Sequence, residues 1–389
     1  MLKRVKGMLV EFFRQADLVL LGFCCAATLF GILLIFSATR YKDSNRFVLV
    51  QSVAMILGIC VYIAFSHVDI EILMRKWKWV LAFNIGFILM LLTPFGASEG
   101  GNRAWLRFPG IPIGIGPAEV VKITFVLLLA WQMNWLKEEK QDLRSFKSAA
   151  SVAGHAIGLC GFYYVISSDM GNGLVFLFIF LCMAFVAGFA LRWFVLLIGG
   201  GVAAVVAAWK LDVMPAHMQE RFIVLFDHSY DPLGAGWHQT RSLLTLGSGG
   251  VLGQGYLNGT QTQSDYSTSL PARWTDFIFS VCGEEFGMLG CIAVILILTA
   301  IVARVLMVAK NARTPFHCNV CVGMAAMLIF QIIINIGMCL FVMPVIGITL
   351  PFFSYGGSSV VTLYMAMGVV SGVKMRSPAM RRPGKPIRN

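Results

Sequence analysis

Residues 270–290 read LPARWTDFIFSVCGEEFGMLG. The stretch opens with polar residues, passes through Asp276, and continues as an apolar run down to Val308. Ionisable groups inside a membrane helix, or at its end, are costly, so function is the default hypothesis for them. The stretch therefore predicts a membrane helix that carries a carboxylate where a long loop joins it.

The composition excludes an ordinary soluble protein. Of 389 residues, 58% are hydrophobic and only 13% are charged, and the mean hydropathy is +0.78. Such values predict a polytopic membrane protein, whose helices pack as one domain. The net charge of +12 follows membrane topology rather than a nucleic-acid surface, because the basic residues gather in one set of connections.

The apolar runs predict an all-α bundle of ten transmembrane helices. They begin near Leu18, Phe47, Trp79, Ala118, Ser151, Gly173, Trp193, Phe277, Val320 and Phe352. An even number places both termini on one side, and the excess of Lys and Arg there makes that side cytoplasmic. We expect a cytoplasmic N-terminus (1–17), a membrane domain (18–373) with an extracellular loop (210–275) between helices seven and eight, and a basic cytoplasmic tail (374–389).

Asp276 is the first candidate for chemistry. Phe277, Ile278 and Phe279 follow it and would remove water from it, which raises the pKa of a carboxyl group toward the range of a general base. We expect Asp276 in the first turn of its helix. The alternative is a carboxylate that only complements the positive end of the helix dipole.

Glu284 and Glu285 lie about two turns deeper, between Gly283 and Gly287. Carboxylates at that depth need partners, and we expect Lys122 or an arginine of an outer loop. Structural pairing and a functional role are equally compatible with this pattern.

Glu119 and Lys122 stand three residues apart in EVVK, on one face of the predicted fourth helix. They form either a self-satisfied ion pair or a site in which Glu119 orients Lys122 toward an anionic headgroup. Arg103 and Arg107, in the loop just before, suit the same task because guanidinium groups bind phosphates in bidentate fashion.

Other polar candidates come from short turns. Asp169, in SSDMGN, is either a further site residue or a helix N-cap. Ser354, Gly356 and Gly357, in SYGGSS, form a compact turn suited to backbone contact with an anion or to close helix packing. The cysteines fall in apolar segments or at their edges, which predicts no structural disulfide.

Several motifs coincide in order and spacing with one family. GNRAWL, GPAEVVK, SDMGN, DPLGAGWHQTRSLLTLGSGGVLGQGYLNGTQ, LPARWTDFIFSVCGEEFG and GITLPFFSYGGSS together resemble the SEDS family of RodA, FtsW and SpoVE. The resemblance covers essentially the whole chain. It implies a ten-helix bundle in the bacterial cytoplasmic (inner) membrane that polymerises lipid II, with undecaprenyl-pyrophosphate-linked glycan as donor.

The resemblance also assigns residues and a partner. The catalytic aspartate of the family's TDFIF motif falls on Asp276, and the Glu and Lys of its QPSExxK motif fall on Glu119 and Lys122. A class B penicillin-binding protein is the implied partner that crosslinks the product. The role could belong to elongation, division or sporulation.

The chain departs from the family at two places. It has Gly116 and Ala118 where the family usually has Gln and Ser, and Ala272 and Trp274 where the family often has Glu and His. The second change removes two polar neighbours of the catalytic aspartate.

We expect Asp276 to act as general base on the acceptor hydroxyl, with Arg103 and Lys122 neutralising the leaving pyrophosphate. A divalent cation, Mg²⁺ or Mn²⁺, is an open expectation, since no spacing specifies a metal. Two other functions stay open: a transporter (flippase) of lipid-linked precursors, and a non-catalytic scaffold of a cell-wall synthesis complex.

Overall fold

The computed structural model describes residues 10–42, 45–99, 102–110, 114–140, 142–228, 230–231, 233–234, 236–266 and 269–377. Within these ranges, nine helices are long and apolar enough to cross a membrane, which confirms a helical polytopic membrane protein. They are α2 (Leu18–Thr39), α3 (Arg46–His67), α6 (Pro117–Lys140), α7 (Phe146–Ser167), α8 (Met170–Ala187), α9 (Leu191–Lys210), α12 (Ile278–Lys310), α13 (Pro315–Cys339) and α14 (Gly357–Arg376).

The third of the ten expected helices is shorter than its neighbours. It consists of α5 (Trp77–Leu89), continued by the 3-10 turn η2 (Met90–Leu92). A short helix, α4 (Ile70–Met74), precedes it, and the 3-10 turn η1 (Arg40–Lys42) follows α2. The long segment between α9 and α12, residues 211–277, also contains helices, namely α10 (Ala216–Phe226) and α11 (Trp237–Ser248). It is called the connecting segment below.

A small hairpin, which the sequence pattern did not predict, lies in the loop between α5 and α6. Strand β1 (Gly96–Glu99) pairs antiparallel with β2 (Asn102–Leu106), with Gly96 opposite Leu106 and Glu99 opposite Asn102. Leu106 makes a further bridge to Ile115, so the hairpin leads straight into the start of α6. The end of the bundle that carries this hairpin and residues 211–277 is called the loop end below.

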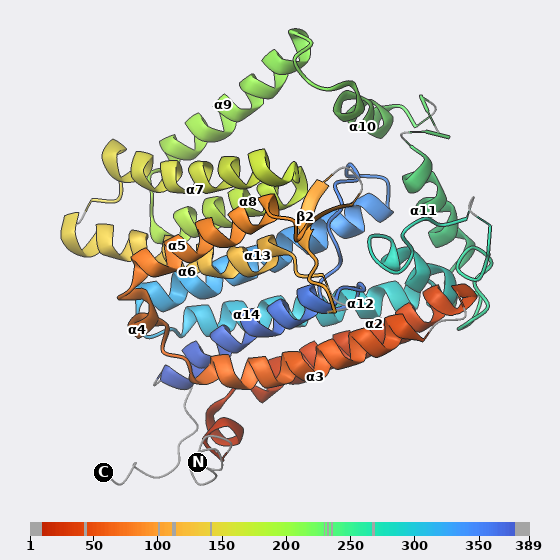
Figure 1. Cartoon of the computed structure of the whole chain (residues 1–389), viewed down its shortest axis with the longest axis horizontal. Coiled ribbons are helices and arrows are strands. Elements are labelled where there is room, and N and C mark those ends of the chain that lie inside the picture. Colours follow the sequence, from red (N-terminus) through yellow and green to blue (C-terminus); the bar gives the residue numbers. More distant parts are fainter. Residues whose placement is uncertain are drawn as a thin grey trace.

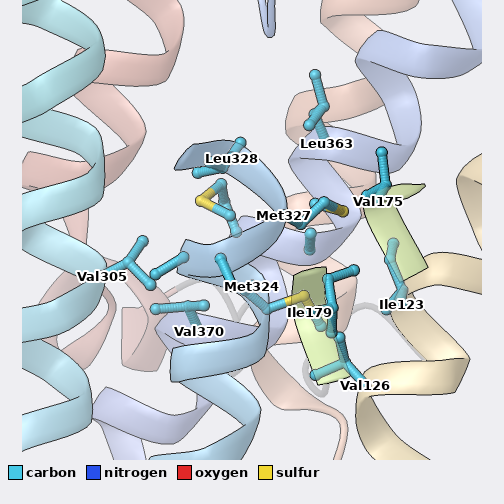
Figure 2. Close-up of a cluster of buried hydrophobic side chains, with 14 of the residues drawn as sticks. Ile123, Val126, Val175, Ile179, Val305, Met324, Met327, Leu328, Leu363 and Val370 are labelled. Atoms are coloured by element: carbon cyan, nitrogen blue, oxygen red, sulfur yellow. The ribbon is translucent and has the colours of Figure 1, made fainter. Parts of the chain in front are cut away.

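Helix α13 is the centre of the packing and touches α6, α8, α12 and α14 (Figure 1). A Cβ added at Gly323 of α13 would lie 2.6 Å from a Val126 methyl and 2.7 Å from the Met183 sulfur. Absence of a side chain therefore lets α6 and α8 approach closely. Figure 2 shows this core, with labelled residues Ile123, Val126, Val175, Ile179, Val305, Met324, Met327, Leu328, Leu363 and Val370.

Helices α3 and α14 make the most extensive helix–helix contact in the bundle. Gly368 and Gly372 of α14 are four residues apart, so both face α3. A Cβ at Gly368 would lie 2.7 Å from the Tyr62 carbonyl oxygen, and one at Gly372 would lie 2.9 Å from that of Ser66. This small-residue seam holds the second half of α14 against α3, and SYGGSS lies at the other end of the same helix.

The opposite end is tied by a buried carboxylate. Asp17 caps α2 through Leu20 N. Its carboxylate also pairs with Arg304 of α12 at 2.8 Å and with Lys374 of α14 at 3.4 Å. The two ends of the predicted membrane domain thus meet; most of the predicted tail (378–389) and the first nine residues lie outside the described residues.

Helix α9 stands away from the other helices (Figure 1). Only 6% of its most apolar window is buried. The other helices of this chain therefore leave most of its apolar surface uncovered.

Candidate catalytic site

Asp276 lies in the turn that precedes α12. The helix begins at Ile278 and Phe277 is its N-cap, so the expectation that Asp276 sits in the first helical turn is wrong. A chain reversal at Ala272, whose φ is +43°, brings Thr275 N and Phe277 N within hydrogen-bond distance of the Ala272 carbonyl. The aspartate is therefore presented by a tight turn at the loop end.

Three consecutive backbone carbonyls hold this turn. The Trp274 oxygen accepts from Tyr355 N at 2.8 Å, and the Thr275 oxygen accepts from Ser354 Oγ at 2.6 Å. The Asp276 oxygen accepts from Asn335 Nδ2 at 2.8 Å. We call these three contacts the carbonyl clamp; it fixes the backbone of the aspartate without using its carboxylate.

Asn335 has a second task in the clamp. Its Nδ2 also donates to the Ile348 oxygen at 2.7 Å, and Ser354 Oγ accepts from Leu350 N at 2.8 Å. The clamp thus joins α13, the segment before α14, and the aspartate turn. An amide within the apolar run IIINIG is the sequence signal for Asn335, since polar groups in membrane helices need partners.

The Asp276 carboxyl group has a higher pKa than an ordinary aspartate. Burial raises its pKa from 3.8 to about 6, while a hydrogen bond with Thr275 acts in the opposite direction. The flanking apolar residues predict this direction. No ion pair between described residues involves Asp276, so it is ionised at neutral pH without a fixed counter-charge.

The Glu119–Lys122 ion pair forms at the start of α6. The Lys122 ammonium is fully buried and lies 2.8 Å from Glu119 Oε1. Ser359 Oγ of α14 donates to the other Glu119 oxygen at 3.4 Å. The pair therefore faces the helix that begins with Gly357, one turn beyond the clamp.

Asp169 is the N-cap of α8, as the simpler alternative predicts. It accepts from Asn172 N at 3.1 Å and from Asn172 Nδ2 at 2.8 Å. It also accepts from the hydroxyl of Tyr163 at 3.1 Å, a residue that no sequence pattern indicated. Gly171 of the same turn packs against the Ile346 carbonyl, so Asp169 borders the segment that the clamp holds.

Arg103 lies on β2 above the start of α6. Its Nη2 donates to the Thr93 oxygen at 3.1 Å, and its buried Nε has no partner in the described part of the chain. Arg107 follows β2, and its backbone N donates to Phe95 O at 2.8 Å. Neither arginine forms an ion pair with Glu119 or Glu284 among the described residues.

Gly356 and Gly357 start α14 with a side-chain tether from α3. Gly356 N donates to Gln51 Oε1 at 3.1 Å, and Gln51 Nε2 donates to the Ser354 oxygen at 3.1 Å. Gln51 thus supports the turn from behind. The Ser354 hydroxyl donates to the Thr275 oxygen and accepts from Leu350 N, so both of its hydrogen bonds are with backbone groups.

Glu284 and Glu285 find partners of a different kind from those expected. Glu284 accepts from Gln261 N at 2.7 Å, from Thr262 N at 2.8 Å and from the Thr262 hydroxyl at 2.6 Å. Glu285 accepts from Ser37 Oγ and from Gln263 Nε2. The expected pairing with Lys122 or an arginine is wrong, because neutral donors of the connecting segment, together with Ser37 of α2, bind these carboxylates instead.

A break in α12 explains how the connecting segment can approach Glu284 and Glu285 so closely. Gly287 has φ +64° and ψ −162°, which only glycine adopts at low cost. The break leaves backbone N–H and C=O groups of α12 without helical partners, and these groups bond to the connecting segment. Gln254 N donates to Glu284 O at 2.8 Å, and Met288 N donates to Gly250 O at 3.0 Å. The glycine-rich stretch after α11 therefore packs against α12 and completes its hydrogen bonds.

The side chain of Trp274 stands beside a cation. Lys42 Nζ lies 3.8 Å from the centre of the Trp274 ring, a typical cation–π arrangement. Arg273 is buried and donates to the carbonyls of Gln261 and Ser264. Trp274 therefore holds η1, and Arg273 holds the connecting segment, against the aspartate turn.

Among the described residues, no group of three or more His, Cys, Asp or Glu side chains could hold a metal ion. These side chains therefore do not by themselves form a binding site for a divalent cation.

The helical fold and this polar set define a polytopic membrane protein with an enzyme-like carboxylate at its loop end. The family model described as cell cycle protein (FtsW, RodA, SpoVE) matches residues 14–378. The chain belongs to this family, which confirms the resemblance that its motifs indicate.

Relatives of similar length match nearly the whole chain in sequence. The chain is 30% identical over 372 residues to a probable peptidoglycan glycosyltransferase FtsW of Geobacter metallireducens, covering 92% of this chain and 95% of that protein. It is 30% identical over 363 residues to the peptidoglycan glycosyltransferase MrdB of Escherichia coli K12, covering 92% and 93%.

Solved structures agree with the fold. A structure described as structural coordination of polymerization and crosslinking by a peptidoglycan synthase complex superimposes with a TM-score of 0.77 at 27% identity, covering 93% of this chain and 98% of that one. Thermus thermophilus RodA superimposes with a TM-score of 0.67 at 25% identity, with the same coverages.

Proposed function

We propose that this protein is a peptidoglycan glycosyltransferase that polymerises lipid II at the outer face of the bacterial cytoplasmic membrane. The carbonyl clamp carries the proposal, because it immobilises an aspartate whose pKa is raised to about 6. A general base works best when its pKa lies near the working pH. The names of the relatives supply the reaction class.

In the proposed mechanism the Asp276 carboxylate takes the proton of the acceptor sugar's hydroxyl. The hydroxyl oxygen forms the new glycosidic bond to the donor's anomeric carbon, and the bond between that carbon and the undecaprenyl pyrophosphate breaks. The buried Nε of Arg103, which lacks a partner, and the Lys122 ammonium are the groups proposed to neutralise the leaving pyrophosphate. Electrostatic stabilisation of this kind is usually the largest single contribution to such catalysis.

The proposed substrate-binding set also includes Glu119, Asp169, Glu285, Ser354, Gly356 and Gly357. Glu119 would orient Lys122, with which it pairs. The hydrogen bonds of Ser354 and of Gly356 N favour a supporting role, in which they shape the turn that meets the substrate.

The proposed topology has ten crossings, with α5 and η2 as the third, both termini cytoplasmic, and the loop end outside. Alkaline phosphatase fused after Leu211 should then be active. Green fluorescent protein fused at the C-terminus should fluoresce. An inactive phosphatase at Leu211 would reverse the orientation and would remove Asp276 from the outer face.

The decisive experiment measures polymerisation of fluorescent lipid II by the purified chain, alone and with a class B penicillin-binding protein. Asp276→Asn should abolish the glycan ladder, while Asp212→Asn, at an exposed outer position, should leave it unchanged. A folded Asp276→Asn protein that still makes ladders would refute the assigned base. Absence of product with the wild type, together with movement of labelled lipid across vesicles, would instead indicate a transporter; neither activity would indicate a scaffold.

A further inference from the structure

A small polar cavity lies at the end of the bundle opposite Asp276. It has a volume of about 70 Å³ and is formed by the last turns of α6 and α8 and the first turns of α13. We call it the Asn319 pocket, after the residue of α13 on its lining. Lys137 of α6, also on the lining, lies fifteen residues from Lys122, which is about 22 Å at the helical rise. The pocket is therefore separate from the candidate catalytic site.

The pocket is reached by the side chain of Asn319, a buried amide. The residue is 5% exposed, and its side chain makes no hydrogen bond within the described part of the chain. Its amide atoms are also not among the unpaired polar atoms that are wholly enclosed, so they keep some accessible surface. Because Asn319 lies on the lining, that surface faces the pocket. Buried polar groups are nearly always hydrogen-bonded, so this amide indicates a partner that enters the pocket.

The same wall of the pocket is the start of a helix. Pro315 and Asn319 are four residues apart on α13, so they share one face, and both line the pocket. Thr314 is the N-cap of this 25-residue helix, whose first turn contains no acidic residue. Glu71 meets that turn on another side, 3.3 Å from His317 Nδ1. The positive end of the helix dipole is therefore open to an anion in the pocket.

The end of α8 also borders the pocket, through its last two residues. Carbonyl groups at a helix end repel an anion, but a left-handed glycine cap closes this end. Gly188 N donates to Phe185 O at 3.2 Å, and Phe189 N donates to Ala184 O at 3.2 Å. Two of the carbonyls at this negative helix end are thus already bonded, which weakens their repulsion of an anion.

Lys137 makes the pocket basic. It is the one charged side chain among the described residues of the lining, and no ion pair within the described ranges involves it. The adjacent carboxylate, Glu138, accepts from Asn134 Nδ2 at 2.9 Å. The exposed ammonium of Lys137 is therefore available to an anion.

The size of the pocket limits which anion fits. One water molecule takes up about 30 Å³, so about 70 Å³ admits a group of a few heavy atoms and excludes a sugar ring or a nucleotide base. An ammonium group, an amide and a helix start are donors that bind phosphate in proteins. The pocket therefore suits the phosphate itself rather than a larger molecule around it.

We propose that the Asn319 pocket binds a phosphate group, whose oxygens accept hydrogen bonds from Lys137 Nζ and Asn319 Nδ2 at the start of α13. The phosphate belongs either to the headgroup of a membrane lipid or to a soluble phosphate. The site does not depend on the proposed reaction.

The first arm of the test is native mass spectrometry of the delipidated full chain, titrated with phosphatidic acid and with diacylglycerol of the same acyl chains, which lacks the phosphate. Asn319→Leu should weaken binding of phosphatidic acid about tenfold, because it removes a hydrogen bond to a charged group. This variant should fold, since it replaces an unpaired buried amide by an apolar group of similar size. Lys137→Gln should weaken binding about threefold or more, whereas Lys78→Gln, exposed at the same end of the bundle, should behave as the wild type.

The second arm is thermal unfolding in inorganic phosphate against chloride at equal ionic strength. A phosphate-dependent rise in Tm that is smaller in Asn319→Leu than in the wild type supports the site and shows that soluble phosphate is sufficient. A response to phosphatidic acid alone supports the site and identifies the lipid headgroup as its source.

Two results would overturn the proposal. The first is equal affinity of the wild type for phosphatidic acid and diacylglycerol, together with a phosphate-dependent rise in Tm that is the same in wild type and Asn319→Leu. The second is binding of phosphatidic acid and of inorganic phosphate that is unchanged in both Asn319→Leu and Lys137→Gln, which would place any phosphate elsewhere. Binding is measured directly, so polymerase activity does not enter either result.

Discussion

Replacing Asp276 by Asn should stabilise the folded protein while it abolishes polymerisation. Burial raises the pKa of this carboxyl from 3.8 to about 6, so the folded state binds the proton more tightly than the unfolded state does. The favourable contribution of Asp276 to stability is fully present below pH 3.8 and is lost as the pH rises through about 6. At neutral pH the fold therefore holds a charge that it disfavours.

The size of this effect follows from the shift. A shift of about 2 pH units corresponds to about 3 kcal/mol at pH 8. Asn also gives up the interaction of a negative charge with the start of α12, which is about 0.3–1 kcal/mol. The desolvation effect is larger, so a net gain of about 2 kcal/mol remains, and at pH 4 the gain should fall below about 1 kcal/mol.

The assay is thermal unfolding of purified protein in detergent at pH 8 and pH 4, for the wild type, Asp276→Asn and the exposed control Asp212→Asn. The Asp276 variant should melt a few degrees higher at pH 8 and close to the wild type at pH 4. A variant that is no more stable than the wild type at pH 8, or one whose gain is the same at both pH values, would contradict the assigned environment of the carboxylate.

Three further changes test the packing around the site. Glu119→Gln should cost about 3–5 kcal/mol in thermal unfolding, because it leaves Lys122 buried and unpaired, and adding Lys122→Met should recover most of that loss. Asn335→Leu should lower the polymerisation rate and move the acid limb of its pH profile below 6, since the released Asp276 regains water; an unmoved limb would mean that Asn335 only supports the fold. Gly249→Ala should reduce folded yield on size-exclusion chromatography, because its Cβ would lie 1.9 Å from the Gly283 oxygen, whereas Gly247→Ala has open space and should be neutral or mildly stabilising.

Hydropathy alone locates most of the fold. The expected start at Leu18 coincides with the observed one, and the expected starts at Phe47, Ala118 and Trp193 lie within two residues of α3, α6 and α9. Length and apolarity decide these elements, because a membrane helix satisfies its backbone internally and needs no partner to be recognised. The hairpin of β1 and β2 escaped prediction, since GASE and NRAWL alternate too weakly to indicate strands.

The charged residues of the candidate site were predictable from the sequence, but the residues that hold them in position were not. Asp276, Glu119 and Lys122 stand out because charge is rare in apolar sequence. Asn335 and Gln51 act through backbone carbonyls and amides that are far away in the chain, and one-dimensional patterns carry no information about such pairs. The partners of Glu284 were mispredicted for a related reason: a search for opposite charge overlooks backbone N–H groups, which serve a buried carboxylate equally well.

The break at Gly287 also restricts which insertions and deletions this chain can accept during evolution. The segment between α9 and α12 would ordinarily be the part most tolerant of insertions, and residues 211–215 are largely exposed and free to lengthen. The stretch from 250 to 262 is different, because its backbone completes the hydrogen bonds of α12 and surrounds the Glu284 carboxylate. A deletion of one residue there would shift the partners of Gly287 and Glu284 together. We therefore expect related sequences to differ in length in the first part of this segment. The second part should keep the same number of residues, as a membrane helix does.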